Sequence, residues 1–188
     1  MAASSTLKNM VLCLTLVCLI CAAVVGVAYA VTKDPIDAAA RAKTTASIAR
    51  VLPAFSATPE EGSVRVGETD YKYYKVGGAG YAIVSATSGF GGLLTLMVGV
   101  AEDGTVYNTT VLSHSETPGL GAKCTDDERF LSQFRGLDPA AKTIAVRKDG
   151  GDLDAITAST ITSRAYALAV SNAVDVFKQL KQGGRSDE

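Results

Sequence analysis

The sequence predicts an α+β fold, in which one transmembrane helix is followed by a domain with a small, mainly antiparallel sheet and flanking helices. Three observations lead to this prediction. An uncharged apolar run near the N-terminus is long enough to cross a bilayer. Short β-branched runs bounded by glycine-rich turns come next, and apolar residues at helical spacing lie near the C-terminus. Strands grouped together, with helices before and after them, are typical of an α+β domain.

The apolar run extends from Asn9 to Thr32, and no residue within it is charged. As an α-helix it would be roughly 36 Å long, against a hydrocarbon core of ~30 Å. The A-x-A sequence at 28–30 has the form of a signal-peptide cleavage site, but the run is longer than the ~7–15 residues of a signal-peptide core. We therefore favour a retained anchor over a secreted protein that begins at Val31. The flanking charges leave the orientation of the anchor open.

The elements after the anchor follow from local patterns. The acidic turn at 102–104, between two strand-like runs, predicts a hairpin. T-D-D-E at 125–128 predicts the capped start of a short helix. In order, we expect a helix at 35–54, a polar turn-rich stretch at 59–67, strands at 71–76, 81–87, 93–100 and 105–113, a helix at 125–135, a strand at 143–147 and a helix at 162–182. The chain then divides into a tail at 1–8, a transmembrane helix at 9–32, a helical connector at 33–60, a domain at 61–182 and a flexible tail at 183–188.

Composition excludes several classes of function. The chain has 188 residues and a net charge of −1, without the basic stripe that nucleic-acid binding requires. Of its four cysteines, Cys124 is the one outside the apolar run, and it cannot form a disulfide within the domain by itself. Because no Cys/His cluster occurs either, we expect neither a disulfide scaffold nor a metal site.

Three stretches could hold a ligand. The first is S-G-F-G-G at 88–92, and the second is H-S-E-T-P-G-L-G at 114–121, where glycines permit close approach of the backbone. The third is D-A-I-T-A-S-T-I-T-S at 154–163, a row of hydroxyls at a helix entrance. From the residues alone, a strand-joining turn at 88–92 and ordinary helix capping at 154–163 are favoured over a ligand site, although a helix N-terminus also favours anions. At 114–121 a surface turn and a ligand loop explain the residues equally well. His114 and Glu116 are too little for an acid–base pair, so we assign no catalytic residue.

The segments at 89–123 and 150–170 resemble the G-subunit family of the Rnf electron-transport complex. The resemblance covers essentially the whole chain, and its motifs occur in the family's order and spacing. The C subunits of Na⁺-translocating NADH:quinone reductases share the FMN-binding domain of this family and are the alternative. The resemblance therefore implies that the predicted domain binds FMN.

The resemblance also implies that FMN is attached covalently, through its phosphate, to a residue of the motif D-x-x-[ST]-G-A-[ST]. In this sequence the motif is formed by Asp154, Thr157, Ala158, Ser159 and Thr160, and Thr160 is the expected attachment site. Ala158 replaces the usual Gly and Ser159 replaces the usual Ala, which puts attachment in question and makes Ser159 an alternative site.

By the same resemblance, Glu116, Thr117, Leu120 and Gly121 form the loop that packs on the isoalloxazine ring, and Lys148 lies near it. The implied function is electron transfer within a membrane complex that couples ferredoxin:NAD⁺ redox chemistry to Na⁺ or H⁺ translocation. Its partners would be the other membrane and peripheral subunits, a flavin transferase and the lipid bilayer. The domain would lie on the outer face of the cytoplasmic membrane. An anchored binding or structural domain without a redox cofactor is the alternative from another class.

Overall fold

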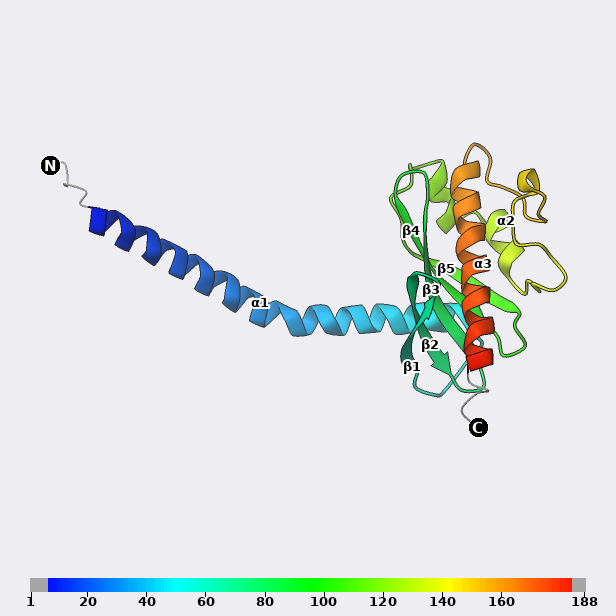
Figure 1. Cartoon of the computed structure of the whole chain (residues 1–188), viewed down its shortest axis with the longest axis horizontal. Coiled ribbons are helices and arrows are strands. Elements are labelled where there is room, and N and C mark those ends of the chain that lie inside the picture. The colour runs from blue at the N-terminus through cyan, green and yellow to red at the C-terminus, as the bar shows by residue number, and fades with distance from the viewer. Residues whose placement is uncertain (1–6, 184–188) are drawn as a thin grey trace. The chain divides into compact units, whose positions relative to one another are not determined.

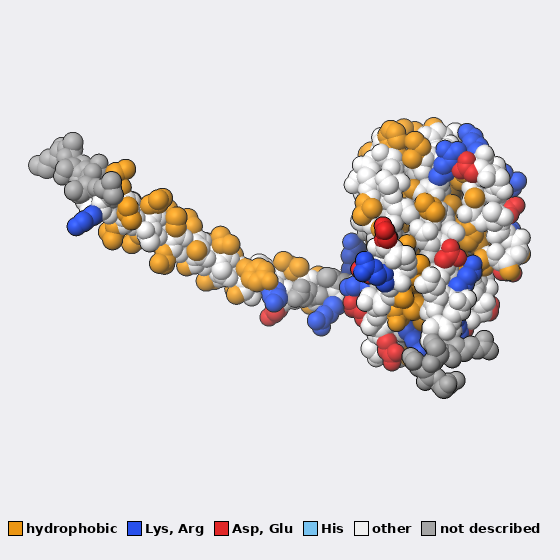
Figure 2. All heavy atoms as spheres, in the orientation of Figure 1, with side chains coloured by type: hydrophobic (Ala, Val, Ile, Leu, Met, Phe, Trp, Pro, Cys, Tyr) orange, Lys and Arg blue, Asp and Glu red, His pale blue; other side chains and the backbone are white. Residues whose placement is uncertain are grey.

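The computed structural model describes residues 7–183 (Figure 1). The chain divides into an N-terminal unit that ends at Thr44 and a C-terminal unit that begins at Thr45. Helix α1 (Leu7–Val51) contains the apolar run, and Pro35 lies inside it. Among the described residues it is the one helix long and apolar enough to cross a membrane. Its most apolar 18-residue window has a mean hydropathy of 2.9. Figure 2 shows hydrophobic side chains along the N-terminal half of this helix.

The C-terminal unit contains a five-stranded antiparallel sheet in which each strand pairs with the next along the chain. The strands are β1 (Glu60–Val66), β2 (Thr69–Val76), β3 (Gly80–Ser88), β4 (Leu93–Val100) and β5 (Val106–Ser113). The predicted α+β class and the hairpin formed by β4 and β5 are confirmed. The polar stretch at 59–67 was expected to be a turn and is instead strand β1. The alternation of apolar and polar residues in β1 is weak, because Val64 and Val66 are the two residues of this edge strand that pack against the core.

Helix α3 (Thr160–Gly183) covers one face of the sheet and packs mainly on β3 and β4. The face predicted for this helix is buried, including Tyr166 and Phe177. The small side chains of Ala165, Ala169 and Ala173 recur every four residues and let the helix approach the sheet closely. The Tyr166 hydroxyl lies 2.7 Å from the Thr109 hydroxyl, so this buried polar group has a partner on β5.

The opposite face of the sheet is covered by the last turn of α1, which belongs to the same compact unit as the sheet. Ile48, Val51 and Leu52 are buried there against a cluster that includes Met97. The approach requires Gly99 on β4, since a Cβ at that position would overlap the carbonyl oxygen of Val51. The end of α1 is therefore part of the core of the C-terminal unit.

Short helical turns connect β5 to α3: η1 (Gly121–Thr125), α2 (Glu128–Leu131), η2 (Ser132–Phe134) and η3 (Arg147–Asp149). The helix predicted to open at Thr125 begins three residues later, because Asp127 is its cap and accepts a hydrogen bond from the Arg129 N–H at 3.0 Å. The predicted strand at 143–147 is wrong. Its Thr143 N–H donates to the Asp152 carboxylate at 2.8 Å, and Val146 forms a single bridge with Leu153 instead of joining the sheet.

Candidate functional site

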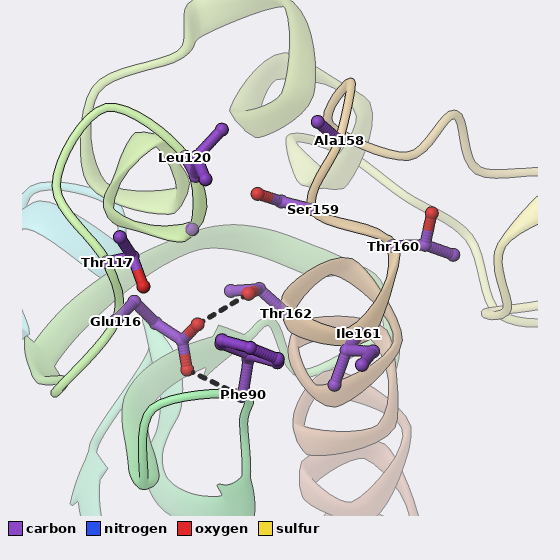
Figure 3. Close-up of a pocket in the computed structure, with 10 residues that line it drawn as sticks. Phe90, Glu116, Thr117, Leu120, Ala158, Ser159, Thr160, Ile161 and Thr162 are labelled. Atoms are coloured by element: carbon purple, nitrogen blue, oxygen red, sulfur yellow. Dashed lines mark hydrogen bonds between the residues drawn. The ribbon is translucent and has the colours of Figure 1, made fainter.

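A cavity of about 330 Å³ lies where the β3–β4 turn, the loop after β5 and the start of α3 meet (Figure 3). These are the three stretches that the sequence singled out as possible ligand sites. Residues of all three stretches line it, although the stretches are separated by tens of residues in the chain. The lining residues are Phe90, Glu116, Thr117, Leu120, Gly121, Ala158, Ser159, Thr160, Ile161 and Thr162.

Glu116 joins the three stretches through its carboxylate, which is buried with 5% of the residue exposed. Its Oε1 accepts hydrogen bonds from the backbone N–H groups of Phe90 at 2.9 Å and Gly91 at 3.2 Å. Its Oε2 accepts a hydrogen bond from the Thr162 hydroxyl at 2.6 Å (Figure 3). Because charge-assisted hydrogen bonds are stronger than neutral ones, this carboxylate fixes the walls of the cavity relative to each other.

Close packing around Glu116 explains the glycines of the two loops. A Cβ at Gly89 would overlap the Glu116 Oε1, and a Cβ at Gly91 would overlap the carbonyl oxygen of Ser115. A Cβ at Gly121 would lie 2.5 Å from the Glu116 Oε2 and 2.7 Å from the Thr162 Oγ1. These glycines are therefore needed for close approach rather than for turning the chain.

The hydroxyls at the start of α3 have different surroundings. The Ser163 Oγ accepts a hydrogen bond from the Ile156 N–H at 2.9 Å and donates one to the Ser159 carbonyl at 2.9 Å, which ties the preceding loop to the helix. Ser159 is 7% exposed, and Figure 3 shows its hydroxyl directed toward Leu120. Thr160 is half-buried, and its side chain is directed away from Glu116 (Figure 3).

The start of α3 also provides backbone donors. The Ser163 N–H donates to the Ser159 carbonyl at 3.0 Å and closes the first turn of the helix. The N–H groups of residues 160–162 precede that turn and have no partner within the helix. Together with the positive end of the helix dipole they can hold an anion, while Phe90, Leu120 and Ile161 offer apolar surface to a flat ligand.

Ala158 adopts the left-handed backbone conformation, with a φ of 63°. It is the one residue other than glycine with a positive φ among the described residues. The family motif has glycine at this position, where a left-handed conformation costs nothing. This chain therefore keeps the glycine-type backbone with an alanine, at a cost of roughly 1–2 kcal/mol.

Three of the predicted site residues do not line the cavity. Asp154 accepts a hydrogen bond from the Arg147 Nε at 2.6 Å, while its backbone N–H donates to the Gln133 Oε1 at 2.6 Å. Thr157 and Lys148 are exposed, and neither is among the lining residues. Asp154 thus anchors the loop that leads into the cavity.

Three other lining residues, Phe90, Ile161 and Thr162, lie in stretches that the sequence singled out, but the sequence assigned none of them a role in binding. Phe90 is 68% exposed at the tip of the β3–β4 turn, and a large apolar residue between glycines was the signal that could have revealed it. The role of Thr162 depends on its bond to Glu116, which lies 46 residues away in the chain. No local pattern indicates such a contact.

Cys124 is fully buried in η1 and does not line the cavity. Burial, with a smaller contribution from the negative charge of Glu116, raises the pKa of its thiol to about 11. Because the thiolate is the reactive form of cysteine, both the burial of Cys124 and this shift disfavour its reaction at neutral pH.

Comparison with known proteins gives consistent matches. Residues 89–175 match the FMN-binding domain family. The chain is 34% identical to the G subunit of the ion-translocating oxidoreductase complex of Cereibacter sphaeroides, over 88% of this chain and 82% of that protein. It is 43% identical to the protein of the same name from Vibrio cholerae, over 52% of this chain and 48% of that protein.

Two further matches have different names. The chain is 39% identical to the G subunit of the proton-translocating ferredoxin:NAD(+) oxidoreductase complex of Clostridium ljungdahlii, over 50% of this chain and 51% of that protein. A solved structure, the C subunit of the Na(+)-translocating NADH-quinone reductase from Parabacteroides distasonis, matches with a TM-score of 0.44 and 26% identity. That match covers 57% of this chain and 60% of the other.

Proposed function

The protein belongs to the family of G subunits of ion-translocating oxidoreductase complexes, and we propose that it carries electrons on FMN within such a complex. The main support for this function is the cavity of about 330 Å³ inside the FMN-binding domain. It combines apolar walls with the start of a helix, while each oxygen of its buried carboxylate accepts at least one hydrogen bond. Such a site holds a cofactor and supplies no nucleophile or general base of its own.

The residues of the cavity suit FMN. Phe90, Leu120 and Ile161 provide apolar surface for a flat ring system. The free N–H groups at the start of α3 suit a phosphate, which helix N-termini bind readily. When bound, FMN supplies one- and two-electron transfer, and the protein contributes binding, orientation and electrostatics.

We further propose that the FMN phosphate is esterified to the hydroxyl of Thr160. The position of Thr160 in the motif supports this, and so does its place as the first residue of α3 and a lining residue of the cavity. A flavin transferase would form the bond between the Thr160 Oγ1 and the flavin phosphate. The pyrophosphate bond of FAD would break, AMP would leave, and the hydroxyl proton would pass to the transferase.

The place of the protein in the cell follows from the family and from α1. We propose that α1 crosses the cytoplasmic membrane once and that the domain lies on its outer face, with Lys148 near the flavin. The partners would be the membrane and peripheral subunits of a complex that couples ferredoxin:NAD⁺ redox chemistry to Na⁺ or H⁺ translocation. One relative is named for proton translocation and ferredoxin:NAD(+) chemistry, which supports this form of the complex.

Substitution of the hydroxyls tests the attachment site. The full-length protein would be produced with its flavin transferase, denatured, and examined for flavin fluorescence that stays with the polypeptide. Thr160→Ala should abolish that fluorescence, while it should change the free energy of unfolding by less than ~1 kcal/mol, because Thr160 is the first residue inside α3 and not its cap. Ser159→Ala removes the neighbouring buried hydroxyl and is the matched control, which should retain covalent flavin. If Ser159→Ala abolished the covalent fluorescence and Thr160→Ala retained it, the attachment site would be Ser159.

A further inference from the structure

The cavity contains a buried negative charge without a counter-ion. Glu116 takes part in none of the ion pairs found between described side chains, such as those of Arg147 with Asp154 and Arg164 with Asp149. The three partners of its carboxylate are hydrogen-bond donors, namely two backbone N–H groups and the Thr162 hydroxyl. A set made only of donors matches the ionised form, which accepts hydrogen bonds and donates none.

Neutral donors stabilise this carboxylate without cancelling its charge. Their dipoles compensate for the lost hydration, which otherwise makes a buried charge costly. The net charge remains and acts on whatever occupies the cavity, at an effective dielectric constant well below that of water. Charged groups placed near a flavin are one means by which proteins tune its electronic properties.

We propose that Glu116 lowers the midpoint potential of the flavin in this cavity, an inference that rests on the proposed function. Two-electron reduction of a flavin at neutral pH takes two electrons from the reductant and one proton from solvent, so it adds one negative charge to the ring system. Repulsion by Glu116 opposes that added charge and leaves the oxidised form favoured. The reduced protein is then a stronger electron donor to the next carrier.

An opposing effect would come from Lys148, which the family resemblance places near the flavin. Lys148 is exposed, whereas Glu116 is 5% exposed and lines the cavity. Solvent and salt screen an exposed charge far more than a buried one. We therefore expect the effect of the Glu116 charge on the flavin to exceed that of Lys148, so that the midpoint potential of the flavin is lowered.

The test is a redox titration of the full-length, flavin-loaded protein in detergent at pH 8, with dithionite as the reductant. Glu116→Gln keeps the shape of the side chain and its Oε1 acceptor, and it removes the charge. We expect the equilibrium constant for reduction to rise at least tenfold, which is about 30 mV for a two-electron couple. Thr162→Val is the matched control, since it removes one hydrogen bond to the same carboxylate and keeps the charge. It should change that constant less than about threefold, or about 14 mV.

Two results would overturn the inference. The first is an unchanged midpoint potential in Glu116→Gln. The second is an equal shift in Glu116→Gln and Thr162→Val, which would show that the lost hydrogen bond, and not the lost charge, changes the potential. If Glu116→Gln does not fold by itself, the comparison is made in a Ser85→Ala background, because Ser85 lies on β3 outside the cavity and its hydroxyl has no hydrogen-bond partner among the described residues. A higher flavin potential in the double variant than in Ser85→Ala supports the inference, and equal potentials contradict it. Absence of flavin from the wild-type protein is visible before any titration and would instead refute the proposed function.

Discussion

At the scale of single residues, the hydroxyl row at 157–163 shows how far the sequence can be interpreted. The motif and the helix start were evident from the residues, and they direct attention to Thr160. The separate roles of Thr162 and Ser163 were not, because they depend on Glu116 and Ile156, which reach these hydroxyls only in the folded chain. Residue types directed attention to this stretch, but they did not indicate which of its hydroxyls serve structure.

Ala158 provides a prediction about backbone strain. Ala158→Gly should raise the free energy of unfolding by ~0.5–1 kcal/mol, because relief of the left-handed strain outweighs the greater flexibility of glycine in the unfolded chain. Urea denaturation of the full-length protein measures the change. Ala155→Gly, in the same loop but without a positive φ, is the matched control and should lower stability. A loss of stability in Ala158→Gly would show that the strain argument is wrong.

At the scale of elements, strands with clear apolar patterns were predicted correctly, as was the final helix. The failures occurred where tertiary contacts decide. Strand β1 is fixed by pairing with β2, where Val64 lies opposite Tyr71, and its own sequence is mostly polar. The alternation at 143–147 resembles a strand, but Asp152 binds the N–H of Thr143 and the segment stays outside the sheet. Local patterns cannot identify which partner a backbone group will find.

The contact between β3 and α3 provides a prediction about two neighbouring hydroxyls. Ser85 is fully buried, and its Oγ has no hydrogen-bond partner among the described residues. The Thr87 Oγ1, two residues along the strand, donates to the Ala165 carbonyl at 2.8 Å. Ser85→Ala should therefore raise the free energy of unfolding by about 1 kcal/mol, and Thr87→Val should lower it by a similar amount.

Urea denaturation of the two variants checks the opposite signs. The pair is internally controlled, since both residues lie on β3 and are buried. If Ser85→Ala were less stable than the wild-type protein, the hydroxyl would have a partner, such as a buried water molecule, that stabilises the native fold.

At the scale of the whole molecule, the protein combines a helix suited to a membrane with a domain suited to a cofactor. The last turn of α1 and the residue after it belong to the core of that domain, through Ile48, Val51 and Leu52. A soluble form of the domain must therefore keep these residues, and a truncation at 61 would expose the apolar face that they cover. The sequence predicted a helical connector over this region, but not its packing on the sheet.

We propose that this chain carries electrons on a covalently attached FMN. The most direct test is the intact mass of the full-length protein, denatured after purification from a host that supplies its flavin transferase. We predict an increase equal to the mass of FMN minus water, located on the peptide that contains Thr160. An unmodified mass, with any flavin lost on denaturation, would contradict covalent attachment; an unmodified mass from a protein that never held flavin would contradict the carrier function itself.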